Sequence, residues 1–166
     1  MTSQGIDKSR YQFIPRVLVF VTRGDEVLLI KRGAQREVFP NQYNGLGGHV
    51  ERGESVLAAA RREVEEESGL ICKGLWLCAV VAIDTGDVSS GIAMWVFRGE
   101  ADGEPRPSAE GEIAWMPVSM IPELQMVEDI PTLLPKVLAM RPGDAPLWGI
   151  YRYTKNGKLS MQFSES

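Results

Sequence analysis

The segment Ser55–Ser68 constrains the fold of this chain more than any other. It has an alanine-rich centre, and its apolar side chains Leu57, Ala60 and Val64 recur along one side of a helix. Gly69 follows directly and can take the left-handed conformation that commonly ends a helix. The sequence therefore predicts a helix that packs one side on a core and leaves the other side open.

Three glutamates share the open side of this helix, because Glu63, Glu66 and Glu67 stand at positions i, i+3 and i+4. Neighbours at this spacing have Cβ atoms roughly 5–6 Å apart, so the carboxylates repel one another unless a cation lies among them. All-oxygen ligands of this kind suit Mg²⁺, which also binds substrate phosphates. A solvated acidic helix face is the common alternative for such a run of residues.

The residues that precede the acidic run favour the metal site. Gly48 closes a long polar loop, Glu54 lies at the start of the helix, and Arg62 lies one turn before Glu66. An arginine in that position can contact the acids and fix their rotamers. The backbone carbonyl of Gly47 can approach a metal ion because no side chain blocks it.

The complete spacing resembles the signature box of the Nudix hydrolase superfamily. The pattern G-x5-E-x7-R-E-U-x-E-E-x-G-U, with U aliphatic, is matched at every defined position by Gly48-(5)-Glu54-(7)-Arg62-Glu63-Val64-(1)-Glu66-Glu67-(1)-Gly69-Leu70. The resemblance implies hydrolysis of a nucleoside diphosphate that is linked to another group. In that reaction metal ions polarise the phosphoryl oxygens and a deprotonated water attacks in line.

The resemblance also implies a role for each box residue. Glu63, Glu66 and Glu67 resemble the metal ligands, and one of the latter two also activates water in some members. Arg62 resembles the residue that orients these acids, and a Gly47 carbonyl would complete the shell around Mg²⁺ or Mn²⁺. The expected structural and outer-shell residues are Gly48, Glu54 and Gly69.

The rest of the chain reads as strands, turns and one more helix. Arg16–Arg23 and Glu26–Lys31 flank a Gly-Asp turn and predict a hairpin, while residues 33–48 read as a loop. Other predicted elements are strands at Leu75–Thr85, Ile92–Gly99, Glu112–Val118, Leu147–Tyr153 and Lys158–Phe163, and a helix at Ile130–Met140 that Pro135 would end or kink in its interior. We expect one α/β domain over residues 1–166, a Nudix-type α/β/α sandwich with a mixed sheet between helices, with residues 1–12 as a loosely ordered lead-in.

The residues around the box resemble the MutT-type and oxidised purine nucleoside triphosphatase group. The stretch YNGLGG at 43–48 resembles a W-N-G-x-G-G stretch of that group, with Tyr43 where tryptophan is frequent. Asn44 matches the asparagine that reads a purine edge there, and an amide can donate and accept at once. The alternative for Asn44 is a turn hydrogen bond of its own.

Late residues extend this resemblance. Glu128 and Asp129 resemble the acidic pair before the C-terminal helix of the animal enzymes, and the segment GIYRYTKNGKLSMQF resembles their final hairpin. These acids would then face the base, although acids at a helix N-terminus also stabilise the helix dipole. Lys31 and Arg32 are candidate phosphate contacts, with ordinary surface charge as the alternative.

Two further residues have competing interpretations. Glu110 stands before Trp115 with the spacing of the family's downstream acid, which is an additional metal ligand or base in some members; Glu112 competes for this role. His49 is the only histidine, and we expect it to contact phosphate or the loop rather than to act as general base.

The composition limits the partners. A net charge of −4 and a pI of 5.1 disfavour polymeric nucleic acid, so the expected partner is a small nucleotide. Cys72 and Cys78 lie in one apolar run and predict buried free thiols, which fits a reducing compartment. The chain shows neither a signal-peptide pattern nor an apolar stretch of about 20 residues. We expect a cytoplasmic monomer or homodimer with no membrane contact.

Other members of the superfamily supply the rival interpretations. The same box also serves hydrolases of ADP-ribose, dinucleoside polyphosphates and pyrimidine nucleotides. A non-catalytic nucleotide sensor usually lacks box acids, all of which are present here. RNA cap hydrolysis would need a basic path for RNA, which the acidic balance disfavours.

Overall fold

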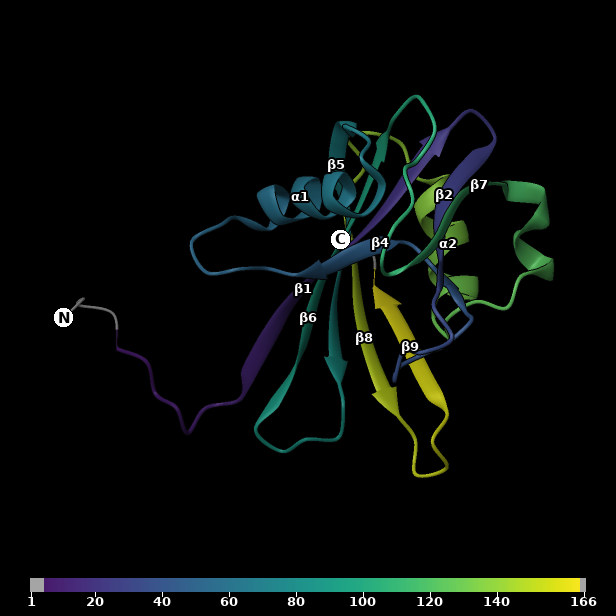
Figure 1. Cartoon of the computed structure of the whole chain (residues 1–166). Helices are drawn as coiled ribbons and strands as arrows, with labels where there is room; N and C mark the ends of the chain where they lie inside the picture. Colours follow the sequence, from purple (N-terminus) through teal and green to yellow (C-terminus); the bar gives the residue numbers. More distant parts are fainter. Residues whose placement is uncertain (1–4, 165–166) are drawn as a thin grey trace.

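The chain folds as a mixed sheet between two helices, seen in a computed structural model that describes residues 5–164 (Figure 1). The strands are β1 (Gln12–Arg23), β2 (Glu26–Arg32), β3 (Tyr43–Asn44), β4 (Leu46–His49), β5 (Lys73–Asp84), β6 (Ser90–Glu100), β7 (Gly111–Pro117), β8 (Leu147–Tyr153) and β9 (Leu159–Ser164). The helices are α1 (Val56–Ser68), the 3₁₀ helix η1 (Val118–Glu123) and α2 (Ile130–Ala139).

The sheet has the order β3-β2-β1-β6-β5-β8-β9, with β4 paired to β1 and β7 paired to β2. The pairs β1–β6 and β5–β8 are parallel, and the other pairs are antiparallel. The predicted mixed sheet and both predicted hairpins are therefore confirmed.

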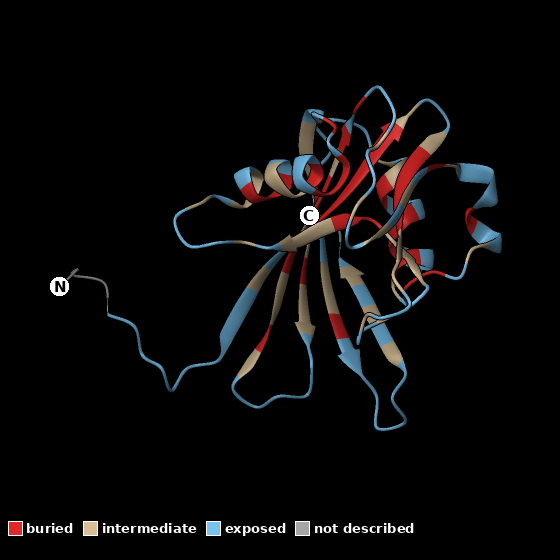
Figure 2. Cartoon of the chain, viewed as in Figure 1, coloured by how far each residue is buried: buried red, intermediate tan, exposed pale blue. Residues whose placement is uncertain are grey.

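Alternate residues of β1 build the two cores of the sandwich. Val17, Val19 and Val21 pack in the cluster that contains the buried side of α1. Leu18 and Phe20 face the other way and pack with the buried side of α2. Helices thus cover both faces of the sheet, and Figure 2 shows the buried residues concentrated where the strands pass between them. This arrangement confirms the α/β/α sandwich.

One edge of β1 is shared by two strands. β1 pairs with β4 over Arg16–Val19 and with β2 over Val21–Arg23. The loop, β3 and β4 that follow β2 therefore return to the same edge of β1 at a different height. The cleft described below lies at this junction.

Helix α1 begins and ends as the sequence predicts. Ser55 caps its N-terminus, where the Ser55 hydroxyl accepts a hydrogen bond from the Ala58 N–H at 3.1 Å. Gly69 ends it in the left-handed conformation, with φ of 74°, and its N–H donates to the Glu65 carbonyl.

The prediction of a loop over residues 33–48 is wrong in its second half, which contains β3 and β4. The glycines that indicated a loop are required by the strand pairing, because a Cβ at Gly47 would collide with the Val17 carbonyl oxygen. A similar collision excludes a side chain at Gly45, which lies against Phe20 and Val19. Close backbone approach, rather than a flexible turn, explains these glycines.

Two other features of the fold differ from the sequence prediction. Helix α2 does not end at Pro135 but continues to Ala139. The proline removes one helical hydrogen bond, and the burial of Leu134 and Val137 on either side of it offsets this loss. The 3₁₀ helix η1 was not expected. Residues 5–11 contain neither helix nor strand, β1 begins at Gln12, and residues 1–4 lie outside the described part, so the loosely ordered lead-in stays a prediction.

The two cysteines are free thiols, but only Cys78 is fully buried, whereas Cys72 is half-buried. Burial raises the pKa of Cys72 to about 11 and that of Cys78 to about 12. Within residues 5–164, no helix is long and apolar enough to cross a membrane.

Candidate active site

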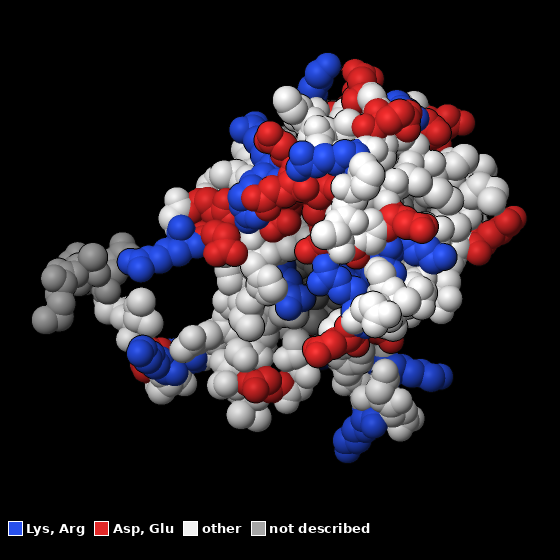
Figure 3. Space-filling view, in the orientation of Figure 1, with Lys and Arg blue, Asp and Glu red and all other residues white. Residues whose placement is uncertain are grey.

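A cleft of about 700 Å³ lies at the junction on β1 and brings the two predicted sites together. The predicted residues that line it are Arg32, Asn44, Gly47, Gly48, Glu63, Glu67, Glu110, Glu128 and Asp129. Acidic side chains gather over α1, and basic side chains lie beside them on the same face (Figure 3). The cleft therefore offers cations and anions next to each other, with an apolar end formed by Leu18, Phe39, Ile83, Ile92, Met94, Val127 and Leu159.

Arg62 links the acids of the box. Its guanidinium donates to both carboxylate oxygens of Glu54, at 2.7 and 3.1 Å, and to the His49 carbonyl at 3.0 Å. It also donates to Glu63 at 2.9 Å and to Glu66 at 3.0 Å. The hydrogen bonds to Glu54, followed by those to Glu63 and Glu66, raise the pKa of Arg62, and Arg62 in turn lowers the pKa of Glu54. This geometry suits a residue that fixes the rotamers of the acids.

Glu67 is the most buried acid of the site, with 7% of its surface exposed. Its Oε2 accepts a hydrogen bond from the Gly47 N–H at 3.0 Å. Burial raises the pKa of Glu67 to about 8, and the charges of Glu110 and Glu63 contribute to the rise. Glu63 also has a raised pKa, mainly because of burial.

Gly48 lets α1 approach β4, because a Cβ at this position would collide with the Glu63 carboxylate. The contact that the structure shows for Gly47 is made by its N–H, so a metal-binding Gly47 carbonyl stays a prediction. Gly69 and Glu54 both lie outside the cleft. Gly69 ends helix α1, and Glu54 accepts hydrogen bonds from the Arg62 guanidinium.

The residues of the site fit a hard divalent cation in their chemistry. Glu66 points to Arg62 and to solvent with 60% of its side chain exposed, and within residues 5–164 no three acidic, histidine or cysteine side chains converge as a finished metal site. Burial and the neighbouring charge of Glu110 nevertheless raise the pKa of Glu63 and of Glu67, which a bound cation would reverse. Their carboxylate oxygens are the donors that Mg²⁺ prefers.

The two candidates for the downstream acid are separated by position. Glu110 lines the cleft and its carboxylate pairs with Arg36 at 3.1 Å. Glu112 lies outside the cleft lining. Geometry thus favours Glu110 for this role.

Strand β3 pairs with the segment that precedes Glu128 and Asp129 and so brings these acids close to β3 and β4. The Tyr43 N–H donates to the Gln125 carbonyl at 2.9 Å, and the Val127 N–H donates to the Tyr43 carbonyl at 3.0 Å. Asn44 therefore lies beside the segment that leads into Glu128 and Asp129. These contacts join segments that are more than 80 residues apart in the sequence.

Asn44 makes the local turn hydrogen bond and also lies where it can contact a ligand. Its Oδ1 accepts from the Gly45 N–H at 2.8 Å, which is the local turn bond. Asn44 also lines the cleft. Its amide N–H₂ remains as a donor for a ligand.

Asp129 stands at the N-terminus of α2, but its carboxylate makes no capping hydrogen bond to a described backbone N–H. Burial raises the pKa of Asp129 to about 6, and the charge of Glu128 adds to this. Glu128 accepts a hydrogen bond from the Tyr153 hydroxyl at 3.1 Å. Both acids line the cleft, so the geometry favours a ligand-facing role over a helix cap for Asp129.

Lys31 and Tyr43 lie outside the lining, where the Lys31 ammonium stands 5.9 Å from the Tyr43 ring centroid. Of the two predicted phosphate contacts, Arg32 alone is thus placed in the cleft. His49 lines the cleft with an exposed side chain.

Sequence reasoning missed several cleft residues, namely Arg16, Arg36, Tyr151 and Tyr153. The alternation in the segment YRY at 151–153 is the one signal that could have placed both tyrosines on a single face of β8. The arginines have no local signal, because pairing between distant strands brings them to the cleft.

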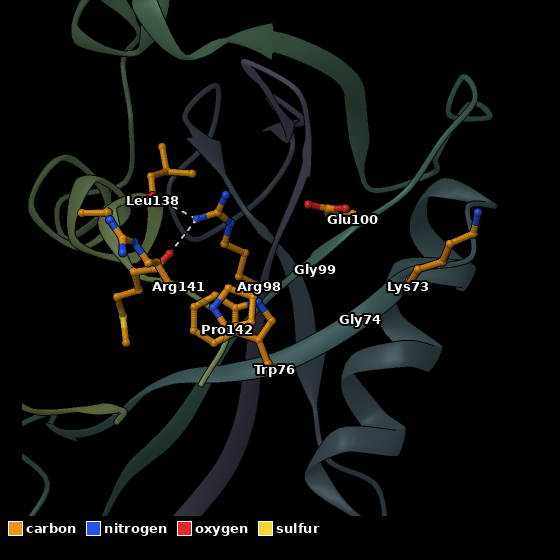
Figure 4. A pocket seen from close by; sticks show the side chains of 11 residues that line it. Lys73, Gly74, Trp76, Arg98, Gly99, Glu100, Leu138, Arg141 and Pro142 are labelled. Atoms are coloured by element: carbon orange, nitrogen blue, oxygen red, sulfur yellow. Dashed lines mark hydrogen bonds between the residues drawn. The ribbon is translucent and has the colours of Figure 1, made fainter. Parts of the chain in front are cut away.

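A second hollow of about 600 Å³ lies at the C-terminal end of α2 and has a structural explanation (Figure 4). Arg98 donates to the carbonyls of Leu138 and Met140, at 2.9 and 3.2 Å, and so satisfies the end of the helix. Trp76 and Pro142 line the same hollow.

Comparisons with known proteins agree with the resemblance that the box carries. The NUDIX domain family matches residues 12–137 of the chain. The chain belongs to the Nudix family. It is 34% identical over 114 residues to the oxidized purine nucleoside triphosphate hydrolase of Danio rerio, a match that covers 68% of this chain and 71% of the relative. This Nudix hydrolase is also 46% identical over 56 residues to the NAD-capped RNA hydrolase NudC of Stutzerimonas stutzeri, but that match covers 34% of the chain and 19% of NudC.

Solved structures show the same fold. A MutT protein from Bacillus halodurans superposes with a TM-score of 0.77 at 26% identity, over 92% of this chain and 98% of that chain. The Nudix domain of Shewanella oneidensis NrtR, solved with ADP ribose, has a TM-score of 0.63 over 80% of this chain and 88% of that one, and at 14% identity it shows the fold alone.

Proposed function

We propose that this Nudix hydrolase is a Mg²⁺-dependent pyrophosphohydrolase that cleaves a purine nucleoside triphosphate, oxidised purines such as 8-oxo-dGTP included, to the monophosphate and pyrophosphate. The observation that carries the proposal is that one cleft is lined both by Glu63 and Glu67 of the box and by the acidic pair Glu128 and Asp129. The name of the Danio rerio relative, an oxidized purine nucleoside triphosphate hydrolase, supports the same substrate class.

The phosphate end of the cleft is lined by Glu63 and Glu67, while Arg62 and Glu66 lie on the same helix outside the lining. Bound Mg²⁺, or Mn²⁺ in its place, would supply the charge that neutralises the phosphoryl oxygens. Arg62 holds the carboxylates of Glu63 and Glu66 in one orientation. Burial raises the pKa of Glu67 to about 8 in the free protein; a bound cation would lower it again and leave a carboxylate that can accept a proton.

The apolar end of the cleft would take the base. Asn44 offers an N–H₂ donor, while Asp129 offers a carboxyl group whose pKa of about 6 lets it donate or accept. Two polar groups of this kind at an apolar pocket can discriminate between base edges, because an unmatched buried polar group is costly.

A panel of nucleotides in the presence of Mg²⁺ tests the proposal, with 8-oxo-dGTP, dGTP, dCTP, ADP-ribose and Ap₄A as substrates. We expect the highest kcat/KM for a purine triphosphate, with release of pyrophosphate rather than phosphate. A clear preference for ADP-ribose, Ap₄A or dCTP would contradict the purine assignment while leaving the chain a Nudix hydrolase. Cytoplasmic location and a monomeric or homodimeric state stay predictions.

A further inference from the structure

Three of the described residues that line the cleft are arginines, and they differ in their partners. Arg36 pairs with the Glu110 carboxylate at 3.1 Å. The Arg32 Nε donates to the Val38 carbonyl at 3.0 Å. Arg16 makes no side-chain hydrogen bond or ion pair with another described residue, so its five N–H donors remain available.

Arg16 lines the cleft from strand β1. It stands on β1 opposite His49 of the glycine-rich strand β4, and two residues before Leu18, which belongs to the apolar end. Because side chains two residues apart point to the same face of a strand, Arg16 and Leu18 face the cleft together. A ligand in the cleft can therefore meet the Arg16 guanidinium.

Arg16 and Arg32 act on each other as like charges. Partial burial lowers the pKa of Arg16, and the charge of Arg32 lowers it further. Two guanidinium groups in one cleft repel each other unless an anion lies within reach of both. Planar guanidinium groups bind phosphate oxygens through paired hydrogen bonds.

We propose that Arg16, together with Arg32, binds the phosphate chain of the substrate on the wall of the cleft that β1 and β2 provide. The inference rests on the proposed function, because it assigns a binding residue to that same reaction. Arg16 stands outside the box and contributes to binding the phosphate chain in the ground state and the transition state alike. Its loss should therefore raise KM and leave kcat nearly unchanged.

The direct test is calorimetric titration of inorganic tripolyphosphate in magnesium-free buffer, where only the chain's own cations bind it. We expect Arg16→Met to weaken binding on the order of tenfold, as the loss of hydrogen bonds to a charged group implies. Arg16→Lys keeps the charge but loses the paired geometry, and it should lie between Arg16→Met and the wild type. The weakening should shrink at high salt.

Arg152 provides a matched control, because it is exposed on β8 and lies outside the cleft lining. Arg152→Met should bind tripolyphosphate as the wild type does. A far-UV circular dichroism spectrum and a melting temperature for each variant test whether the substitutions at Arg16 and Arg152 preserve the fold.

The outcomes separate this inference from the proposed function. Wild-type affinity in Arg16→Met, or no tripolyphosphate binding by the wild type, overturns the role of Arg16. An unchanged KM for the best triphosphate substrate in Arg16→Met overturns it as well. Weakened tripolyphosphate binding in a protein that hydrolyses no nucleoside triphosphate supports the role of Arg16 and refutes the proposed function.

Discussion

Glu67 is buried in the free protein, yet its proposed role requires an ionised carboxylate. Its pKa is raised to about 8 from a usual value of 4.5, mainly by burial. The stability that the protonated form contributes is complete below a pH of about 4.5, and it is lost as the pH rises to about 8. Glu67→Gln removes this loss and should melt at a higher temperature than the wild type at pH 9 without magnesium.

The same substitution should abolish function. We expect Glu67→Gln to lower kcat by about 10³ or more, given what general bases and charge-stabilising groups contribute. Glu65→Gln is the matched control, because Glu65 is exposed on the same helix and lies outside the cleft lining. Turnover near that of the wild type in Glu67→Gln would remove Glu67 from the catalytic site.

The ionisation of Asp129 should make the preference between purine bases depend on pH. Its pKa of about 6, raised by burial and by Glu128, means that it is mostly protonated at pH 5 and mostly ionised at pH 7. The ratio of kcat/KM for 8-oxo-dGTP to that for dGTP should therefore change between these pH values. In Asp129→Asn the ratio should stay constant. The ratio cancels the titration of the metal site, and a pH-dependent ratio that persists in Asp129→Asn would contradict this role.

At the scale of the elements, Arg98 stabilises the C-terminal end of α2. Its guanidinium donates to three backbone carbonyls at this end of the helix, those of Val137, Leu138 and Met140. Loss of these bonds in Arg98→Met should lower the free energy of unfolding by about 1.5–3 kcal/mol, the range for hydrogen bonds that involve a charged group. Urea unfolding measures this loss, while kcat/KM should stay close to the wild-type value because the hollow at Arg98 is separate from the cleft.

The elements also show how far the sequence could predict the fold. Helix α1 carries its own start and stop in Ser55 and Gly69, so local residues were sufficient to place it. Strands β3 and β4 are short, and the close approach of Gly47 to Val17 depends on a strand that is distant in the sequence. No local propensity contains that information, and the segment therefore resembled a loop.

The candidate site divides in the same way. The box fixes the spacing of Arg62, Glu63 and Glu67 on one helix, and the structure places Glu63 and Glu67 in the cleft as that spacing suggests. Arg16 and Tyr151 reach the same cleft only through the order of strands in the sheet. Residues of this kind become visible when the topology is known.

At the scale of the whole molecule, β1 and β2 connect the two cores. Alternate residues of these strands pack with α1 on one face and with α2 on the other, so neither core can lose its strands while the other stays intact. We therefore expect residues 12–164 to unfold as one cooperative unit, consistent with the single domain that the sequence predicts.

Two tryptophans report on the separate faces and test this expectation. Trp115 packs in the core beneath α1, and Trp76 packs against the core beneath α2. In variants that retain only one of them, with the other tryptophans replaced by phenylalanine, urea unfolding should give the same midpoint by fluorescence as by far-UV circular dichroism. The comparison is made within each variant, so a change in stability caused by the replacements does not affect it. A Trp76 transition that precedes the loss of circular dichroism would show that the face covered by α2, which holds the base end of the cleft, unfolds by itself.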